Sequence, residues 1–178
     1  MKWIIAIFLA ISPACAQSVR EKTGINQMLD RAPTGSDVLL ELHQFDLFQQ
    51  ATTDSSDKRG DDAVKKFAVS QSDAAEKRDK QLAVLQKKTR LDITFPDEPN
   101  ADRSNRLAGL DGAVGEKYLA NFYSAESTEF EAAISLLTRY STKPDNDDIR
   151  QFAEKLLPVL RPQAIAAFGT QIAAIRKV

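Results

Sequence analysis

The sequence predicts an all-α fold, an antiparallel four-helix bundle with one long crossover connection. Four segments place apolar residues at steps of three and four, the spacing of a helix that buries one face. The alternation of a half-buried strand occurs in one short stretch only, residues 91–95. A stretch that carries two prolines separates the second helical segment from the third and provides the long connection.

The first two helices and the connection follow from local signals. Residues 38–51 form the first helix, with Ser36 as its expected N-cap. Residues 52–60 are polar and typical of a turn. Residues 61–89 form the second helix, which opens with two aspartates at the positive end of its dipole. Residues 91–106 then form the long connection. The apolar face of the first helix consists of Val38, Leu39, Leu42, Phe45 and Phe48.

The third and fourth helices fill the rest of the chain. The third is expected over residues 105–140, with three glycines near its start. Residues 141–146 form a turn, and the fourth helix begins near Asp147. Pro158 and Pro162 lie inside that helix. Each proline removes a backbone donor, so we expect a kink or an end there.

Two of the predicted helices carry polar residues inside their apolar seams. In the second helix, Gln71 and Arg78 take positions where a bundle normally places Leu or Ile. In the third helix, Glu126 and Glu129 interrupt the stripe in the same way, one turn apart. A buried arginine needs a carboxylate partner. We therefore interpret these four residues as a structural network, with the two glutamates facing Arg78 and Gln71 across the bundle.

Residues 1–16 have the layout of a secretory signal peptide. Lys2 supplies a positive charge, an apolar run follows, and Ala14 and Ala16 are small residues at the −3 and −1 positions of a cleavage site. We expect cleavage after Ala16 and export to the periplasm or cell envelope. The alternative is lipid attachment at Cys15, although Ser rather than an aliphatic residue stands three positions before it.

Length and composition indicate one globular domain. Of the 178 residues, 43% are hydrophobic and 28% are charged. Residues 17–35 read as an arm or linker, and residues 36–175 as the helical domain. A net charge of −1 means that the chain lacks the excess of basic residues that is typical of nucleic-acid-binding proteins. No window after the leader is apolar enough for a transmembrane span, so we expect none in the mature chain.

The sequence contains few candidate metal-ligating or catalytic residues. His43 is the only histidine, and no Glu-x-x-His pair occurs, which argues against a di-iron site. His43 lies off the apolar face, and we interpret it as a partly exposed or capped helix residue. No nucleophile-elbow motif occurs, and the only cysteine lies in the leader. We expect no catalytic residue and no cofactor. The alternative is a divalent metal such as iron or zinc, held by Glu126, Glu129 and His43.

Four short motifs, taken in their order and spacing, resemble a known family. They are Ala63-Val64-Lys65-Lys66-Phe67-Ala68, Leu82-Ala83-Val84-Leu85, Gly112 followed by Tyr118-Leu119, and Leu156-Leu157-Pro158-Val159-Leu160. Over roughly residues 37–172 the chain resembles domain of unknown function 4142, a family of exported bacterial proteins often labelled predicted outer membrane protein. The resemblance implies a ferritin-like four-helix domain.

The resemblance also implies three histidines that this chain lacks. Counted from the motifs, the family's histidine positions fall on Ala75, Glu126 and Gln163. Only Glu126 offers a good metal ligand among these three. The sequence therefore predicts an exported envelope protein, a non-enzymatic binding or stress-related helical module that has lost the family's histidines. A metal-binding or redox bundle is the alternative, and no partner is specified by the sequence.

Overall fold

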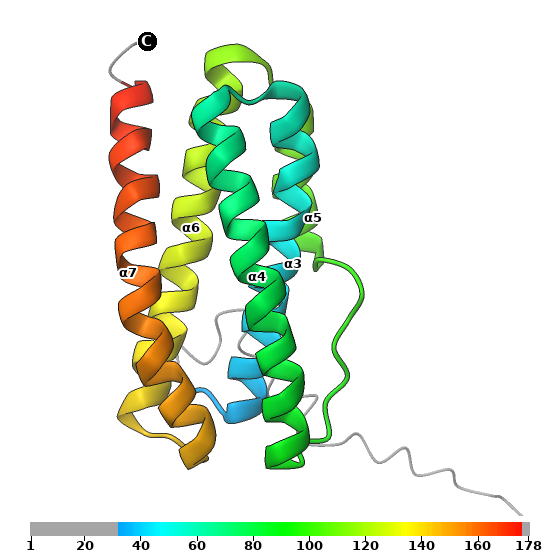
Figure 1. Ribbon diagram of the computed structural model, residues 1–178, viewed down its shortest axis with the longest axis vertical. Helices are drawn as coiled ribbons and strands as arrows, with labels where there is room; N and C mark the ends of the chain where they lie inside the picture. The colour runs from blue at the N-terminus through cyan, green and yellow to red at the C-terminus, as the bar shows by residue number, and fades with distance from the viewer. Residues whose placement is uncertain (1–31, 176–178) are drawn as a thin grey trace, which may run out of the picture.

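The part of the chain that the structure describes is all-helical, which confirms the predicted fold class. This computed structural model describes residues 32–175, and the predicted leader, residues 1–16, lies outside that range. No strand occurs within the described range, so the candidate strand at 91–95 was wrong. Five helices are present there (Figure 1): α3 (Gly35–Arg59), α4 (Asp62–Thr89), α5 (Ala101–Asp111), α6 (Gly115–Thr142) and α7 (Asp147–Ile175).

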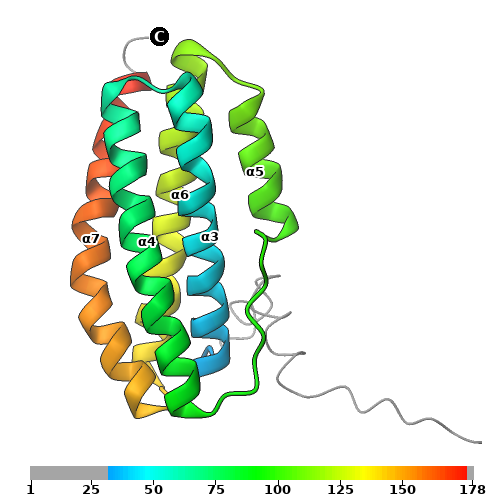
Figure 2. The ribbon, with the colours of Figure 1, turned by 45° about the vertical axis from the view of Figure 1, so that its right-hand side comes forward.

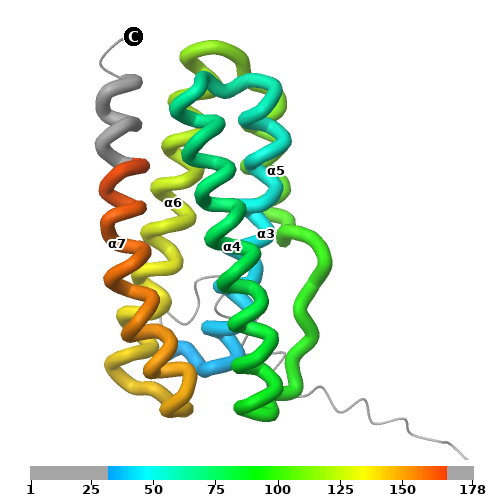
Figure 3. The backbone as a smooth tube through the Cα atoms, in the orientation of Figure 1, coloured from blue at the N-terminus to red at the C-terminus, as the bar shows by residue number. Residues whose placement is uncertain are grey.

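The four long helices lie side by side along one axis, and the short helix α5 lies on an outer flank (Figures 1 and 2). The chain ascends along α3, descends along α4, and crosses back through residues 90–114, which include α5 (Figure 3). It then descends along α6 and ascends along α7. Long helices in contact are α3 with α4, α6 with α7, α3 with α6, and α4 with α7. Each of these pairs is antiparallel.

Side-chain caps fix the start of four helices, and at α7 the cap is Asn146, whose Oδ1 accepts from the backbone N–H groups two and three residues later. Thr34 caps α3 in a capping box: its hydroxyl accepts from the Asp37 N–H, and the Asp37 carboxylate accepts from the Thr34 N–H at 2.9 Å. Ser36, the expected cap, therefore lies inside the helix. Asp61 and Asn100 cap α4 and α5, each by accepting from the backbone N–H three residues later.

Helix α3 is longer than its polar C-terminal half suggests. Residues 52–60 were expected to form a turn, but α3 continues to Arg59. The hydroxyls of Thr52 and Ser56 donate to the helix's own carbonyls three residues earlier, at 2.9 and 2.8 Å. These bonds satisfy the two hydroxyls within the helix, so their side chains are compatible with its continuation to Arg59.

The predicted third helix is in fact two helices. Helix α5 ends at Asp111, Gly112 is its C-cap, and α6 begins at Gly115, whose φ of +58° lies in the left-handed region that favours glycine. Helix α7, in contrast, continues through Pro158 and Pro162 and does not end at either. Within the described range, no helix is both long and apolar enough to cross a membrane.

Two apolar clusters form the core. The larger joins α3, α4, α6 and α7 and contains Phe45, Leu82 and Phe130. The smaller joins α4, α5 and α6 and contains Ala68 and Tyr123. On α4 and α6 the smaller cluster lies nearer the start of the helix, and on both helices a stretch of buried polar residues separates it from the larger cluster.

Candidate functional site

A layer of buried polar side chains separates the two apolar clusters. On α4, Gln71 and Arg78 lie between the last residue of one cluster and the first of the other. On α6, Glu126 and Glu129 occupy the same kind of position. All four side chains are at most 5% exposed. The sequence thus identified four interior residues of this polar layer, but their partners differ from those expected.

Arg78 pairs with Asp46 of α3, and neither glutamate of α6 is its hydrogen-bonding partner. Its Nε donates to Asp46 Oδ1 at 2.7 Å, its Nη2 contacts the same oxygen, and its guanidinium lies 4.7 Å from the centre of the Phe45 ring. Burial raises the pKa of Asp46 to about 7, and the positive charge of Arg78 opposes that rise. Asp46 was missed, although it lies one helical turn after Leu42 on the apolar face.

Glu126 pairs with an amide. Its Oε2 accepts a hydrogen bond from Gln49 Nε2 of α3 at 2.8 Å, and both side chains are fully buried. Burial raises the pKa of Glu126 to about 8, the bond from Gln49 opposes the rise, and the nearby charge of Glu129 adds to it. Glu126 is therefore largely protonated at neutral pH. Gln71, the remaining member of the predicted network, is buried on α4.

Glu129 is bound by two arginines of α5. Its Oε2 accepts from Arg103 Nε at 2.8 Å, and its Oε1 pairs with Arg106 Nη2 at 2.7 Å. Arg103 also donates from Nη1 to Glu41 Oε2 of α3 at 3.2 Å. We call this series Glu41–Arg103–Glu129–Arg106 the charge chain. It joins α3, α5 and α6, and its arginines were missed because residues 91–106 were expected to form the long connection.

His43 holds the crossover connection against the bundle. Its Nδ1 lies 2.5 Å from Asp79 Oδ1 of α4, and its Nε2 lies 2.7 Å from the Pro96 carbonyl oxygen. Phe95 stacks on the ring, with centroids 4.6 Å apart. The carboxylate and the carbonyl are both acceptors, so each ring nitrogen of His43 faces an oxygen to which an N–H can donate. At 7% exposure, His43 is more buried than the sequence suggested.

Glutamine side chains complete the attachment of the connection. Gln44 of α3 donates to the Glu98 carbonyl at 3.1 Å and accepts from the Asn100 N–H at 2.6 Å. Gln86 of α4 donates to the Ile93 carbonyl at 2.5 Å. Because the connection leads directly into α5, these bonds also fix where α5 begins.

The three candidate metal ligands have separate partners. Glu126 contacts Gln49, Glu129 contacts the arginines of α5, and His43 contacts Asp79. Within the described residues, no group of three or more His, Cys, Asp or Glu side chains is arranged to hold a metal ion.

A cavity of about 240 Å³ lies beside the charge chain, between α3, α5 and α6. We call it the α5 cavity. All four members of the charge chain line it, together with apolar side chains from the larger cluster. Its lining residues are Glu41, Phe45, Asn100, Asp102, Arg103, Arg106, Thr128, Glu129, Ala132, Ala133, Leu136 and Arg139.

Comparison with known proteins places this chain in a family. Residues 21–168 match the family described as "Domain of unknown function (DUF4142)", which is most of the chain. A search of curated proteins and a search of solved structures each found no match. The match spans all of α3 to α6 and most of α7, including every residue of the charge chain. The chain therefore belongs to the DUF4142 family.

Proposed function

We propose that this protein is an exported, non-enzymatic binding protein of the cell envelope, and that the α5 cavity is its ligand site. The observation that carries the proposal is a cavity walled by charged residues that already hold one another in place. A site whose side chains are fixed before binding loses less conformational entropy when the ligand arrives.

The proposed architecture is a ferritin-like four-helix bundle. Long helices in contact run antiparallel, and the long crossover joins α4 to α6, which run in the same direction (Figures 1 and 3). One long crossover connection is the arrangement that distinguishes ferritin-like bundles from simple up-and-down bundles. In this protein the crossover also carries α5, and so supplies one wall of the cavity.

The ion pairs of the two carboxylates in the charge chain favour a role in binding over a role in catalysis. Both oxygens of Glu129 are engaged by arginines, and Glu41 accepts from Arg103. A general acid or base must exchange its proton with a substrate. Carboxylates that are held in place by paired guanidiniums serve better as a rigid wall than as proton carriers.

A ligand screen on the protein purified from the envelope tests this proposal. Thermal unfolding would be measured against a library of small cations, anions and neutral compounds, because a ligand that binds the folded state raises the melting temperature. The Ala132→Trp variant fills the cavity from its rim, and Ala108→Trp on the outside of α5 is the matched control.

We expect at least one compound to stabilise the native protein and the Ala108→Trp variant but not the Ala132→Trp variant. A library without any stabilising compound would contradict the proposal. So would compounds that stabilise the Ala132→Trp variant as well as the native protein.

A further inference from the structure

We propose that the α5 cavity selects a small organic anion, a single carboxylate with a short apolar body, and that Arg106 recognises the carboxylate. This inference rests on the proposed function and names the chemical class of its ligand. It follows from which donors in the cavity are already used, from the charge balance of the lining and from its apolar side.

The two arginines of the charge chain differ in whether they keep an N–H donor without a hydrogen-bond partner. Arg103 is 6% exposed and is divided between Glu129 and Glu41. Arg106 uses Nη2 for Glu129, and its Nε is a buried donor without a hydrogen-bond partner among the described residues. A buried N–H without an acceptor costs about 1–3 kcal/mol. An acceptor from a ligand would remove that cost, and a carboxylate matches the fork of donors on a guanidinium.

The charge balance of the lining disfavours a ligand with several negative charges. The charged lining residues are Arg103, Arg106 and Arg139 against Glu41, Asp102 and Glu129, so their formal charges cancel. Each negative charge on a ligand therefore enters a lining without excess positive charge, and this cost is smallest for an anion with one charge. The first turn of α5 lines the cavity through Asn100, Asp102 and Arg103, and the positive end of its helix dipole adds a modest preference for an anion.

The remaining lining favours a ligand with an apolar part. Phe45, Ala133 and Leu136 belong to the larger apolar cluster and also line the cavity. A volume of about 240 Å³ is below the range of about 300–1,000 Å³ that is typical of sites for drug-sized molecules. A short-chain carboxylate fits both properties.

Calorimetric titration with hexanoate and with its uncharged analogue hexanamide tests the inference directly. For the native protein we expect hexanoate to bind at least about tenfold more tightly than hexanamide, since each neutral contact is weaker than its charge-assisted equivalent. An excess of inorganic phosphate is expected not to displace hexanoate, because phosphate carries more charge and no apolar part.

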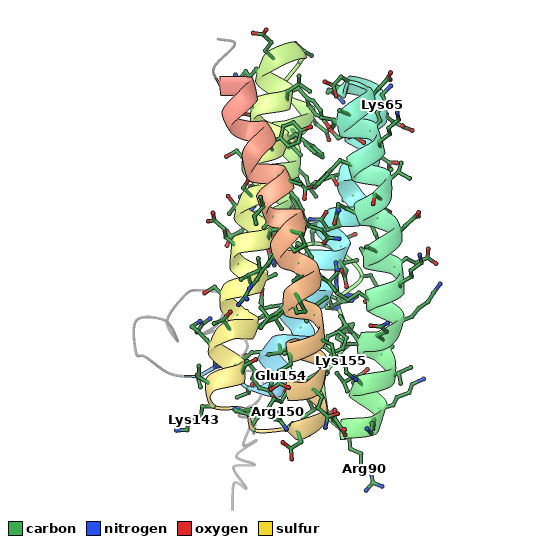
Figure 4. The ribbon with its side chains drawn as sticks, turned by 60° about the vertical axis from the view of Figure 1, so that its left-hand side comes forward. Lys65, Arg90, Lys143, Arg150, Glu154 and Lys155 are labelled. Carbon is green, nitrogen blue, oxygen red and sulfur yellow. The ribbon has the colours of Figure 1, made fainter. Side chains whose placement is uncertain are left out.

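Variants assign the role of Arg106. Arg106→Lys keeps a positive charge beside Glu129 and removes the Nε–H, so we expect the Kd for hexanoate to rise about tenfold or more. Arg150→Lys is the matched control: Arg150 lies on α7 beside Glu154 (Figure 4), is bonded to it at 2.9 Å, and does not line the cavity. Its Kd should stay within about twofold of the native value.

Each contrary result has its own meaning. Equal binding of hexanamide and hexanoate to the native protein overturns the preference for an anion while leaving the cavity as a ligand site. An unchanged Kd in Arg106→Lys overturns the role of Arg106. If hexanoate fails to bind while the screen finds a cation or a neutral compound that Ala132→Trp excludes, the ligand class is wrong and the proposed function survives. If nothing binds in either experiment, both proposals fail.

Discussion

Arg78 and Asp46 form an ion pair inside the protein, with 2.7 Å between Nε and Oδ1. The Asp46 side chain is fully buried and that of Arg78 is 5% exposed. A pair at this depth has lost the hydration of both charges, so its net contribution to stability is small, but either charge alone is costly. The pair therefore makes α3 and α4 depend on each other.

Replacing Arg78 alone should destabilise the protein strongly. We expect Arg78→Met to lower the free energy of unfolding by about 3–5 kcal/mol at pH 8, because Asp46 is left buried without a partner. The double variant Asp46→Leu, Arg78→Met should recover most of that loss. Urea unfolding followed by circular dichroism measures both. An Arg78→Met protein as stable as the native one would show that the pair does not couple the two helices.

Glu126 should make the protein less stable as the pH rises. Its pKa is about 8 in the folded state, against 4.5 for an ordinary glutamate, so the folded protein holds a proton that the unfolded chain releases. The free energy of unfolding therefore falls between about pH 4.5 and pH 8, by at most about 1.4 kcal/mol per pH unit for this one group. Asp46, with a pKa of about 7, adds to the fall over a lower range.

The Glu126→Gln variant isolates this effect. The amide keeps an acceptor for Gln49 and cannot ionise, so we expect a flatter dependence on pH and higher stability than the native protein at pH 8. Urea unfolding at pH 5, 6.5 and 8 gives the comparison, and Asp46→Asn shows the share of the other acid. Identical pH profiles for the native protein and Glu126→Gln would mean that Glu126 is ionised throughout.

Burial of the polar layer could be predicted from sequence, but its pairing could not. Each of Gln71, Arg78, Glu126 and Glu129 interrupts an apolar stripe within its own helix, and the period of a single helix decides which residues point inward. Which residues then meet depends on how far neighbouring helices are shifted and rotated against each other. That shift brings Arg78 to Asp46, a relationship that no local pattern specifies.

The α5 cavity could not be predicted from the sequence, for a different reason. Two of its three arginines, Arg103 and Arg106, lie in or next to a segment where two prolines and a run of polar residues favour a connection over a helix. Helix α5 is only 11 residues long and would be marginal in isolation. It is held by tertiary contacts, namely the charge chain and the bonds from Gln44, which a reading of local periodicity does not detect.

Metal removal should leave the protein unchanged. Glu126, Glu129 and His43 each bond to a different protein partner at 2.5–2.8 Å, and no group of three ligating side chains within the described residues is arranged to hold a metal ion. We expect elemental analysis of the protein purified from its native envelope to find no stoichiometric iron, zinc or manganese. The melting temperature should be the same before and after chelator. Stoichiometric metal together with a chelator-sensitive melt would make Glu126 and Glu129 ligands after all.

Export should produce a mature chain that begins at Gln17. The small residues Ala14 and Ala16 suit a signal peptidase, so N-terminal sequencing and intact mass of the envelope-fraction protein should both give Gln17. Ala16→Arg should block processing and leave the leader attached. Cys15→Ser should change neither the cleavage site nor the fraction in which the protein is found. A mature chain that begins with a lipid-modified Cys15 would contradict this prediction.

His43 should control how firmly the crossover is attached. His43→Phe keeps a ring to stack on Phe95 but removes the bonds to Asp79 and Pro96, so we expect a loss of about 1–3 kcal/mol, concentrated in local opening of this region. Hydrogen exchange should accelerate in residues 91–111 and change little in α7, which serves as the internal control. Because that segment supplies one wall of the α5 cavity, ligand binding should weaken in parallel. Exchange that accelerates equally throughout the protein would show that His43 supports the whole fold and has no special role in attaching the crossover.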